Sequence, residues 1–268
     1  MTRIRETGTY LDRILAQTVK TVGAGKEGVS PLEMATRART APPPVELKIP
    51  ADTLGVIAEF KRASPSKGRF DADVDPRNVA DAYRNGGAIA ISCLTDEPFF
   101  QGSLDDLDTV VATVESKIPV LRKDFTVDSY QSDEARAHGA SMILLIVAVL
   151  EDRQLVEFIE HSRLLGMQAL VEVHDDEEAR RAMDAGAALI GINNRDLRSF
   201  HTDLAVTERI APLFPTGTTI VGESGIHTVE DAERMAAAGC QAILVGESLI
   251  MQQDRAAAVR ELARLRRG

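Results

Sequence analysis

The chain alternates short apolar runs with longer stretches of helical periodicity from about residue 55 onward. Eight such runs occur, at residues 56–58, 88–91, 120–121, 142–145, 169–171, 189–192, 219–221 and 242–245. Each run is too short for a helix and almost continuously apolar, as expected of strands buried on both faces of a parallel sheet. Eight strands separated by helices form a closed (β/α)8 barrel, so the pattern predicts an α/β fold of the TIM-barrel type.

Glycine is expected to end four of the predicted helices. Gly87, Gly139, Gly186 and Gly239 each close a helical stretch and lead into an apolar run, and glycine readily adopts the left-handed conformation that ends a helix. The copies recur roughly every 50 residues, about two strand–helix units. A doubly wound open sheet would alternate in the same way. However, no G-x-G-x-x-G follows any of these runs, so we favour the barrel over a dinucleotide-binding sheet.

The first part of the chain follows a different pattern. Residues 10–22 place apolar side chains on one helical face, and Ser30 followed by Pro31 supplies the cap and the first-turn proline of a second helix. Three consecutive prolines then stop helical structure. We therefore expect residues 1–50 to form an N-terminal helical extension packed on the barrel, and residues 51–268 to form the catalytic barrel domain.

Composition and charge narrow the possible partners. Hydrophobic residues make up 44% of the chain and the formal net charge is -10, which argues against nucleic acid because phosphate backbones are bound by clustered Lys and Arg. No apolar run approaches the ~20 residues that span a bilayer, and the first residues do not resemble a secretion signal. The two cysteines, Cys93 and Cys240, suit neither a disulfide framework nor a metal site. We expect a cytoplasmic protein with no membrane partner, and a monomer because no strong exposed apolar stripe is evident.

Charged side chains gather at the ends of the predicted strands, where the active sites of such barrels lie. Glu59 and Lys61 are two residues apart after the first run, so a strand directs both to one side, as a structural ion pair or as an acid/base pair. Other runs end in further polar or charged residues, namely Lys123, Glu172, Asn193 and Arg195. Any one of these could lie in a solvated loop. Together, two amines and two acids around one cavity should shift one another's pKa values as proton transfer requires.

Glycine-containing loops follow the last two runs. Gly222-Glu223-Ser224-Gly225 comes after the seventh run and Gly246-Glu247-Ser248 after the eighth. These two loops are the usual phosphate site of the barrel fold, because glycine exposes backbone N–H groups there. One such loop would be weak evidence. The pair predicts a phosphorylated small-molecule substrate.

Few aromatic residues occur, yet several fall in loops above strands. Phe99, Phe100 and Phe125, with Leu145 and Leu197, could line a flat apolar slot. Alternatively, the phenylalanines simply plug the top of the barrel.

Six ordered motifs resemble those of the indole-3-glycerol-phosphate synthase family, and the resemblance covers nearly the whole chain. They lie at residues 57–68 (IAEFKRASPSKG), 100–103 (FQGS), 121–125 (LRKDF), 172–174 (EVH), 191–197 (GINNRDL) and 222–226 (GESGI). The resemblance implies a carboxy-lyase of tryptophan biosynthesis that needs no cofactor or metal. Its reaction converts 1-(2-carboxyphenylamino)-1-deoxyribulose 5-phosphate to indole-3-glycerol phosphate with loss of CO2 and water.

The resemblance also implies roles for individual residues. Lys123 is the acid that stabilises the oxyanion formed when the ring carbon attacks the ketone, and Glu172 stabilises positive charge on the anilino nitrogen or takes its proton. Lys61 and Glu59 are candidates for the acid/base step of dehydration, with the order of proton transfers left open. The catalytic set is completed by Asn193 and Glu223. The expected substrate contacts are Ser64, Pro65, Phe100, Phe125, Arg195 and Leu197, and the expected phosphate binders are Ser224, Gly225 and Gly246.

Two details qualify this assignment. Arg195 suits a carboxylate because its guanidinium offers two parallel donors. Glu247 stands where some family members have serine, and a carboxylate turned inward would repel a phosphate, so we leave it out of the phosphate binders.

Three other functions fit the sequence less well. A phosphoribosylanthranilate isomerase is the nearest rival, but the N-terminal extension and Glu59-Phe60-Lys61 argue against it, since we would expect a Cys-led first strand there. A catalytically silent phosphate-binding barrel would lack one of the charged residues at its mouth, and none is missing. A metal enzyme is disfavoured because the five histidines, at positions 138, 161, 174, 201 and 227, show no ligand spacing.

Overall fold

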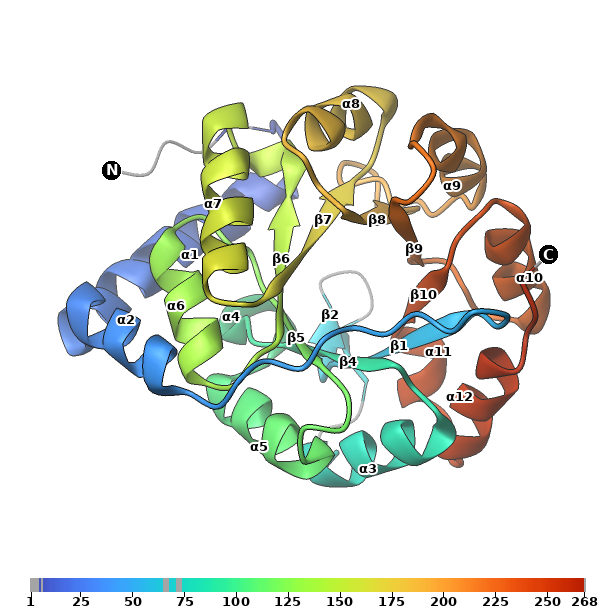
Figure 1. Ribbon diagram of the computed structural model, residues 1–268, viewed down its shortest axis with the longest axis horizontal. Helices are drawn as coiled ribbons and strands as arrows, with labels where there is room; N and C mark the ends of the chain where they lie inside the picture. The colour runs from blue at the N-terminus through green and yellow to red at the C-terminus, as the bar shows by residue number, and fades with distance from the viewer. Residues whose placement is uncertain (1–4, 6, 65–67, 71–73, 268) are drawn as a thin grey trace.

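Eight parallel strands close into a barrel in the computed structural model (Figure 1), which describes residues 5, 7–64, 68–70 and 74–267. The strands are β1 (Gly55–Phe60), β4 (Ala90–Leu94), β5 (Val120–Lys123), β6 (Met142–Ile146), β7 (Gln168–Val173), β8 (Leu189–Asn193), β9 (Thr219–Glu223) and β10 (Ala242–Val245). Ile57 of β1 pairs with Ala90 on one side and with Leu244 on the other, which closes the barrel. Each apolar run overlaps one of these strands, so the predicted TIM barrel is confirmed.

Helices surround the strands (Figure 1). They are α3 (Pro76–Gly86), α4 (Glu97–Phe100), α5 (Leu104–Val114), α6 (Ser129–Ala137), α7 (Asp152–Leu164), α8 (Asp176–Asp184), α9 (Ala205–Ile210), α10 (Val229–Ala237), α11 (Glu247–Ile250) and α12 (Arg255–Ala263), with 3-10 turns at Val147–Val149 and Ala211–Leu213. The glycines expected to end helices have left-handed backbones, with φ of 97° at Gly87, 81° at Gly139, 76° at Gly186 and 98° at Gly239. Each turns the chain from a helix toward the next strand.

A short antiparallel hairpin follows β1 and was not predicted. It consists of β2 (Ala63–Ser64) and β3 (Gly68–Arg69), and the Phe70 N–H closes its base on the Arg62 carbonyl oxygen at 2.8 Å. Strands of two residues with little apolar content leave no periodic signal in the sequence. Pro65, one of the expected substrate contacts, lies outside the described residues.

The N-terminal segment folds into α1 (Tyr10–Gly28) and α2 (Pro31–Thr40), as expected. Ser30 Oγ accepts from the Glu33 N–H and Pro31 takes the first turn, so the predicted cap is confirmed. Leu11, Ile14 and Leu15 of α1 are buried in the main core. The extension therefore adds apolar surface to the barrel core.

The segment after α2 crosses the amino-terminal ends of the strands before it enters β1 (Figure 1). The Val45 N–H donates to Ser141 Oγ at 2.9 Å, and the Leu47 N–H donates to Gln168 Oε1 at 2.7 Å. Because Ser141 precedes β6 and Gln168 opens β7, these bonds fasten the segment to the end of the barrel opposite the strand carboxyl ends. Among the described residues, no helix combines the length and apolar character needed to cross a bilayer.

Candidate active site

A cavity of about 180 Å³ opens at the carboxyl ends of the strands. It is lined by every expected site residue that the structure describes: Glu59, Lys61, Ser64, Phe100, Lys123, Phe125, Glu172, Asn193, Arg195, Leu197, Glu223, Ser224, Gly225 and Gly246. Residues spread over more than 180 positions of the chain therefore meet around one hollow. This convergence follows from the fold, because all eight parallel strands point their carboxyl ends the same way.

Four ionisable side chains form one layer at the bottom of the cavity. Glu59, Lys123, Glu172 and Glu223 come from β1, β5, β7 and β9, which are alternate strands in the barrel order. Alternate strands contribute the side chains of a single layer inside a TIM barrel. The three carboxylates are almost completely buried, with 6%, 2% and 2% of the residue exposed, so any charge that they carry must be compensated nearby.

Lys123 lies between two of these acids. Its Nζ is 3.3 Å from Glu172 Oε2 and 3.8 Å from Glu223 Oε2. Burial alone would lower the pKa of Lys123, but the nearby carboxylates of Glu172, Glu223 and Glu59 outweigh it and raise that pKa above its usual range. Lys123 is therefore an ammonium at neutral pH, positioned to donate a proton or to stabilise an oxyanion.

The Glu172 and Glu223 carboxyl groups differ in ionisation although they share Lys123. Burial opposes ionisation of Glu172, yet Lys123 and His174 more than offset it and lower its pKa below the usual range. Burial and the negative charge of Glu172 together raise the pKa of Glu223 well above its usual range, against the influence of Lys123. One acid thus holds a negative charge while its neighbour retains a proton, a combination suited to acid–base chemistry.

Lys61 and Glu59 form a second acid–base pair, with Nζ 2.8 Å from Oε1. Burial would raise the pKa of Glu59, but the positive charges of Lys61 and Lys123 lower it overall. Lys61 directly follows β1, and its side chain lies on the same side as that of Glu59, as their spacing of two predicted. The pair faces the cavity, so it can serve as more than a structural ion pair.

Two glycines make room for the carboxyl groups. A Cβ at Gly191 of β8 would collide with Glu223 Oε1, and a Cβ at Gly246 would collide with Glu59 Oε1. Each acid therefore occupies space that only glycine leaves free. Gly246 thereby has a second role beside the backbone contact expected of it.

The loops after β9 and β10 also line the cavity. Ser224 and Gly225 both have left-handed backbones, with φ of 63° and 78°. Gly225 requires glycine for a second reason, because a Cβ there would meet the Thr202 side chain. Ser248 Oγ donates to the Ile226 carbonyl oxygen at 3.0 Å and ties the two loops together. An anion in the cavity would thus face a preformed backbone surface.

An apolar wall completes the cavity. Phe100 and Phe125 pack with ring centroids 6.0 Å apart, and both remain partly exposed to the hollow. The two rings therefore line an apolar slot in the cavity rather than plugging the top of the barrel. The prediction that Leu145 lines this slot is wrong, because Leu145 is fully buried away from the cavity. Leu144 lines the cavity in its place, since neighbouring strand residues face opposite sides.

The N-terminal extension supplies part of the wall, which the sequence did not reveal. Tyr10 packs edge-to-face on Phe99 and on Phe200, with centroids 6.0 Å and 5.9 Å apart. Leu11 and Ile14 also line the cavity. The amphipathic stripe of α1 indicated that the helix packs on something, but no local pattern shows which surface it covers.

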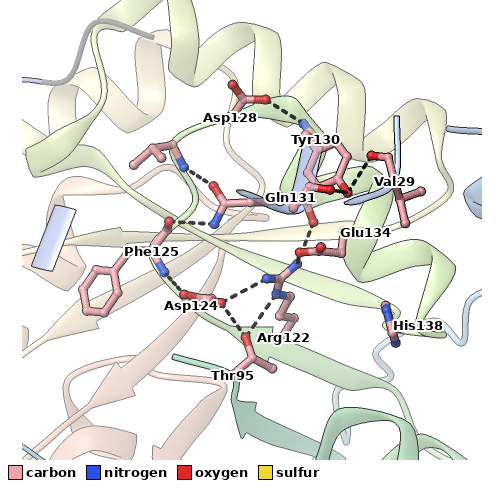
Figure 2. Close-up of polar contacts among 12 residues, drawn as sticks. Val29, Thr95, Arg122, Asp124, Phe125, Asp128, Tyr130, Gln131, Glu134 and His138 are labelled. Atoms are coloured by element: carbon pink, nitrogen blue, oxygen red, sulfur yellow. Dashed lines mark hydrogen bonds and ion pairs between the residues drawn. The ribbon is translucent and has the colours of Figure 1, made fainter. Parts of the chain in front are cut away.

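A buried polar network surrounds Arg122, the residue before Lys123 (Figure 2). Arg122, 5% exposed, donates to Thr95 Oγ1 at 3.1 Å and to Asp124 Oδ2 at 3.1 Å, and pairs with Glu134 at 2.8 Å. Asp124 Oδ1 accepts from the Phe125 N–H at 2.8 Å. The loop that follows β5 is thus fixed on both sides of Lys123, and with it the Phe125 ring. Sequence reasoning treated Arg122 only as part of a motif.

Arg195 lies at the mouth of the cavity. One of its guanidinium nitrogens donates to the Phe200 carbonyl oxygen at 3.3 Å, and its backbone N–H donates to Asn193 Oδ1 at 3.1 Å. The same loop is closed by a bridge between Arg195 and Thr202. Within the described part of the chain, no group of three His, Cys, Asp or Glu side chains is arranged to hold a metal ion.

Solved structures with similar folds include a thiamine phosphate pyrophosphorylase from Pyrococcus furiosus and a 3-hexulose-6-phosphate synthase from Salmonella typhimurium. The first has a TM-score of 0.60 at 18% identity and covers 78% of this chain and 93% of its own. The second has a TM-score of 0.61 at 15% identity and covers 78% and 97%. At such low identity these similarities show the barrel fold alone.

Sequence comparison is more specific. The family model for indole-3-glycerol phosphate synthase matches residues 11–262. Proteins named indole-3-glycerol phosphate synthase from Mycolicibacterium smegmatis and Mycobacterium tuberculosis are each 48% identical over 256 residues, which is 95% of this chain and 93% of theirs. The chain therefore belongs to the indole-3-glycerol phosphate synthase family of carboxy-lyases.

Proposed function

We propose that the cavity performs the reaction of its family: the ionisable side chains carry out the proton transfers, and the loops after β9 and β10 bind the phosphate. The substrate is 1-(2-carboxyphenylamino)-1-deoxyribulose 5-phosphate, and the product is indole-3-glycerol phosphate. The observation that carries this proposal is the position of Lys123 Nζ between two buried carboxyl groups, 3.3 Å from Glu172 and 3.8 Å from Glu223, in a cavity that also has an apolar slot. Ring closure needs an acid, a base and a dry pocket for an aromatic ring at one place.

In the first step, the ring carbon that bears the carboxylate attacks the ketone carbon. The ketone oxygen gains the electron pair of its double bond and takes a proton from Lys123. Positive charge develops on the anilino nitrogen, and Glu172 stabilises it from the same layer of the barrel. Charged groups held in a buried site act strongly here because no solvent must reorganise around the developing charges.

The second step releases CO2, and the bonding electrons return to the ring. The third step removes water, for which one group must protonate the departing hydroxyl and another must take a proton. Lys61 and Glu59, 2.8 Å apart at the same mouth, are the proposed pair for this step. Asn193, which hydrogen-bonds Glu172, keeps that carboxylate oriented through both changes.

The proposed binding mode anchors the substrate at both ends. Backbone N–H groups of Ser224, Gly225 and Gly246 hold the phosphate, and Arg195 holds the carboxylate until it leaves. The aromatic ring lies in the slot formed by Phe100, Phe125 and Leu197, with Ser64 and Pro65 as further contacts. Two anchors and a slot hold the ring and ketone in a near-attack geometry, which supplies a large part of the rate.

The test is a continuous fluorescence assay of the purified chain with no added metal or cofactor. We expect indole fluorescence to appear with 1-(2-carboxyphenylamino)-1-deoxyribulose 5-phosphate and not with phosphoribosylanthranilate. Turnover of phosphoribosylanthranilate instead would establish the isomerase. Absence of turnover with both compounds would favour a silent phosphate-binding barrel.

We further propose that the chain works as a cytoplasmic monomer, with residues 1–50 belonging to the same catalytic unit as the barrel of residues 51–268. One chain supplies all the groups that the proposed reaction needs, so no partner subunit is required. Light scattering after size exclusion should give a mass near 29.0 kDa. A dimer at micromolar concentration would contradict the proposal.

A further inference from the structure

Glu172 is held from two sides by groups of opposite charge. Its Oε2 faces Lys123 Nζ at 3.3 Å, and its Oε1 faces His174 Nε2 at 3.3 Å. The second contact is an ion pair rather than a well-aligned hydrogen bond. Glu172 and His174 are two residues apart where β7 ends, so the extended backbone directs both side chains to one side.

A third side chain holds His174 from behind. Glu178 Oε2 lies 3.0 Å from His174 Nδ1 and also accepts the His174 backbone N–H at 2.8 Å. Glu178 is itself fixed at the start of α8, where its N–H donates to the capping Asp175 Oδ1 at 2.8 Å. The result is a continuous row: Glu178, His174, Glu172 and Lys123.

Each ring nitrogen of His174 faces a carboxylate oxygen. A neutral imidazole would turn a lone pair toward one of them, whereas an imidazolium presents a proton to both. Its side chain is only 11% exposed, so solvent does little to weaken these contacts. Burial opposes the positive charge, but contacts with Glu172 and Glu178 raise the pKa of His174 to about 10.

We propose that His174 is a positioning residue: it remains an imidazolium, holds Glu172 ionised, and orients it toward Lys123 and the substrate. His174 does not line the cavity, so it acts through Glu172. The inference rests on the proposed catalytic role of Glu172.

The positive charge has a specific task, because the layer contains more acids than amines. The ionisable groups facing Glu172 are Glu59 of β1, Lys123 of β5, Glu223 of β9 and His174, which directly follows β7. Glu172 and Glu223 compete for one proton. Glu172 faces two cations, Lys123 and His174, whereas Glu223 shares only Lys123. The proton therefore stays on Glu223. Loss of His174 would move that proton toward Glu172.

The test compares His174→Gln with a matched variant, His161→Gln. His161 of α7 also pairs with a carboxylate, with Nε2 3.1 Å from Asp133 Oδ1, but it does not line the cavity. In His174→Gln we expect the acidic limb of kcat against pH to move upward by about one pH unit or more, since an opposite charge is lost. Near neutral pH, kcat should fall about ten- to a hundredfold with little change in KM. In His161→Gln the profile should match that of the wild type.

A purely structural role would lower the melting temperature of His174→Gln and leave the shape of its pH profile unchanged. That result would overturn the inference. Glu178→Gln provides a second variant in case His174→Gln does not fold. Because it removes only the carboxylate behind His174, it should move the acidic limb in the same direction by a smaller amount, and an unchanged limb would contradict the proposal.

A second measurement does not depend on activity. Nitrogen NMR of 15N-histidine-labelled protein reports the protonation of each ring, and the His174 signal is identified by its loss in His174→Gln. We expect both ring nitrogens of His174 to remain protonated at pH 8. A neutral ring at pH 8 overturns the inference even in an active enzyme. An inactive wild-type protein with a charged His174 would instead defeat the proposed function.

Discussion

The two sides of the cavity present charge to a ligand by different means. On the acid–base side, strands end in ionisable side chains: Glu59, Lys61, Lys123, Glu172 and Glu223. On the backbone side, the loops after β9 and β10 present main-chain groups: Ser224, Gly225 and Gly246. The first set can gain and lose protons during a reaction. The second cannot titrate, because a peptide N–H keeps its partial charge at every relevant pH.

This difference separates chemistry from anchoring. A group that must change its charge within each cycle has to be a side chain with a tuned pKa, whereas a dianionic phosphate needs only fixed donors. Substitutions on the acid–base side should therefore change kcat and the pH profile. Substitutions on the backbone side should change KM. The two sides touch at Gly246, whose missing side chain leaves room for Glu59.

The largest effect is expected for Lys123→Ala. Removing the ammonium that receives the developing oxyanion should lower kcat by at least about 10²-fold. KM should change little, because the backbone side still holds the phosphate. Steady-state kinetics by indole fluorescence measures both constants.

Lys117→Ala is the control for that variant. Lys117 comes after α5 and, like Lys123, pairs with an acid, Glu115, but both side chains are largely exposed on the surface. Its kinetics should equal those of the wild type. If Lys123→Ala retained more than about a tenth of wild-type turnover, Lys123 would be removed from the acid role, since loss of a transition-state donor costs far more.

Glu172→Gln should come next, with kcat lowered about 10²-fold, as expected when a general acid–base group is lost. The amide keeps the shape of the side chain and removes its charge, so circular dichroism should show a folded barrel. Glu160→Gln, which alters an exposed glutamate paired with Arg163, is the control. A raised KM with unchanged kcat would show that Glu172 binds substrate rather than transferring protons, and would contradict the proposed difference between the two sides of the cavity.

Most of the acid–base side was predictable because its members come just after apolar runs, whereas Glu223 was expected only from the family resemblance. A strand buried on both faces is a strong signal, and the polar residues just after its apolar run are brought to the mouth by the fold itself. Lys123 and Glu172 were found in this way. Leu145 was assigned wrongly because counting an apolar run does not say which of its members faces inward. The alternation of Leu144 and Ile146, both in the cavity, carries that information.

Contacts between distant elements were not predictable. Tyr10 of the N-terminal extension contacts Phe200, which lies far along the barrel sequence, and no local pattern encodes that pairing. Arg122 looked like one charge in a motif, and only the packing of α6 shows that Glu134 compensates it. The β2–β3 hairpin escaped notice because two-residue strands have no period to detect. In each case the missing information lies in tertiary packing rather than in local sequence.

Gly225→Ala tests the backbone side and should have a smaller effect. A Cβ at this left-handed position costs roughly 1–3 kcal/mol of strain and collides with Thr202, so the loop must shift. KM should rise about tenfold with kcat changed much less, since tenfold corresponds to only about 1.4 kcal/mol. Inorganic phosphate should also inhibit the variant more weakly.

Gly217→Ala separates strain from anchoring. Gly217 has φ of 100° and open space around it, so an added Cβ strains the backbone there without meeting a neighbour. It should lower the melting temperature and leave KM unchanged. Equal KM values for Gly225→Ala and the wild type would mean that the backbone side does not hold the phosphate.

The smallest effect concerns stability and sharpens the contrast between a titrating side and a non-titrating one. Burial and the charge of Glu172 raise the pKa of Glu223 above its unfolded value. At pH values above the ordinary pKa of a glutamate, the folded state therefore binds more protons than the unfolded state. The contribution of Glu223 to the free energy of unfolding is thus complete at acid pH and is lost as pH rises. Glu223→Gln has no titrating group at this position, so it does not lose this stability as pH rises.

We therefore expect the melting temperature of Glu223→Gln minus that of the wild type to increase from pH 5 to pH 9. The raised pKa of His174 also weakens the fold as pH rises, but both proteins contain His174, so its contribution cancels in the difference. Each kcal/mol should appear as roughly 2–4 °C in a chain of this size class. Gly225→Ala, which changes no titrating group, should show a difference from the wild type that stays constant over the same range. A constant difference for Glu223→Gln as well would mean that Glu223 is ionised like any exposed acid, and the two sides of the cavity would then differ in shape but not in their coupling to protons.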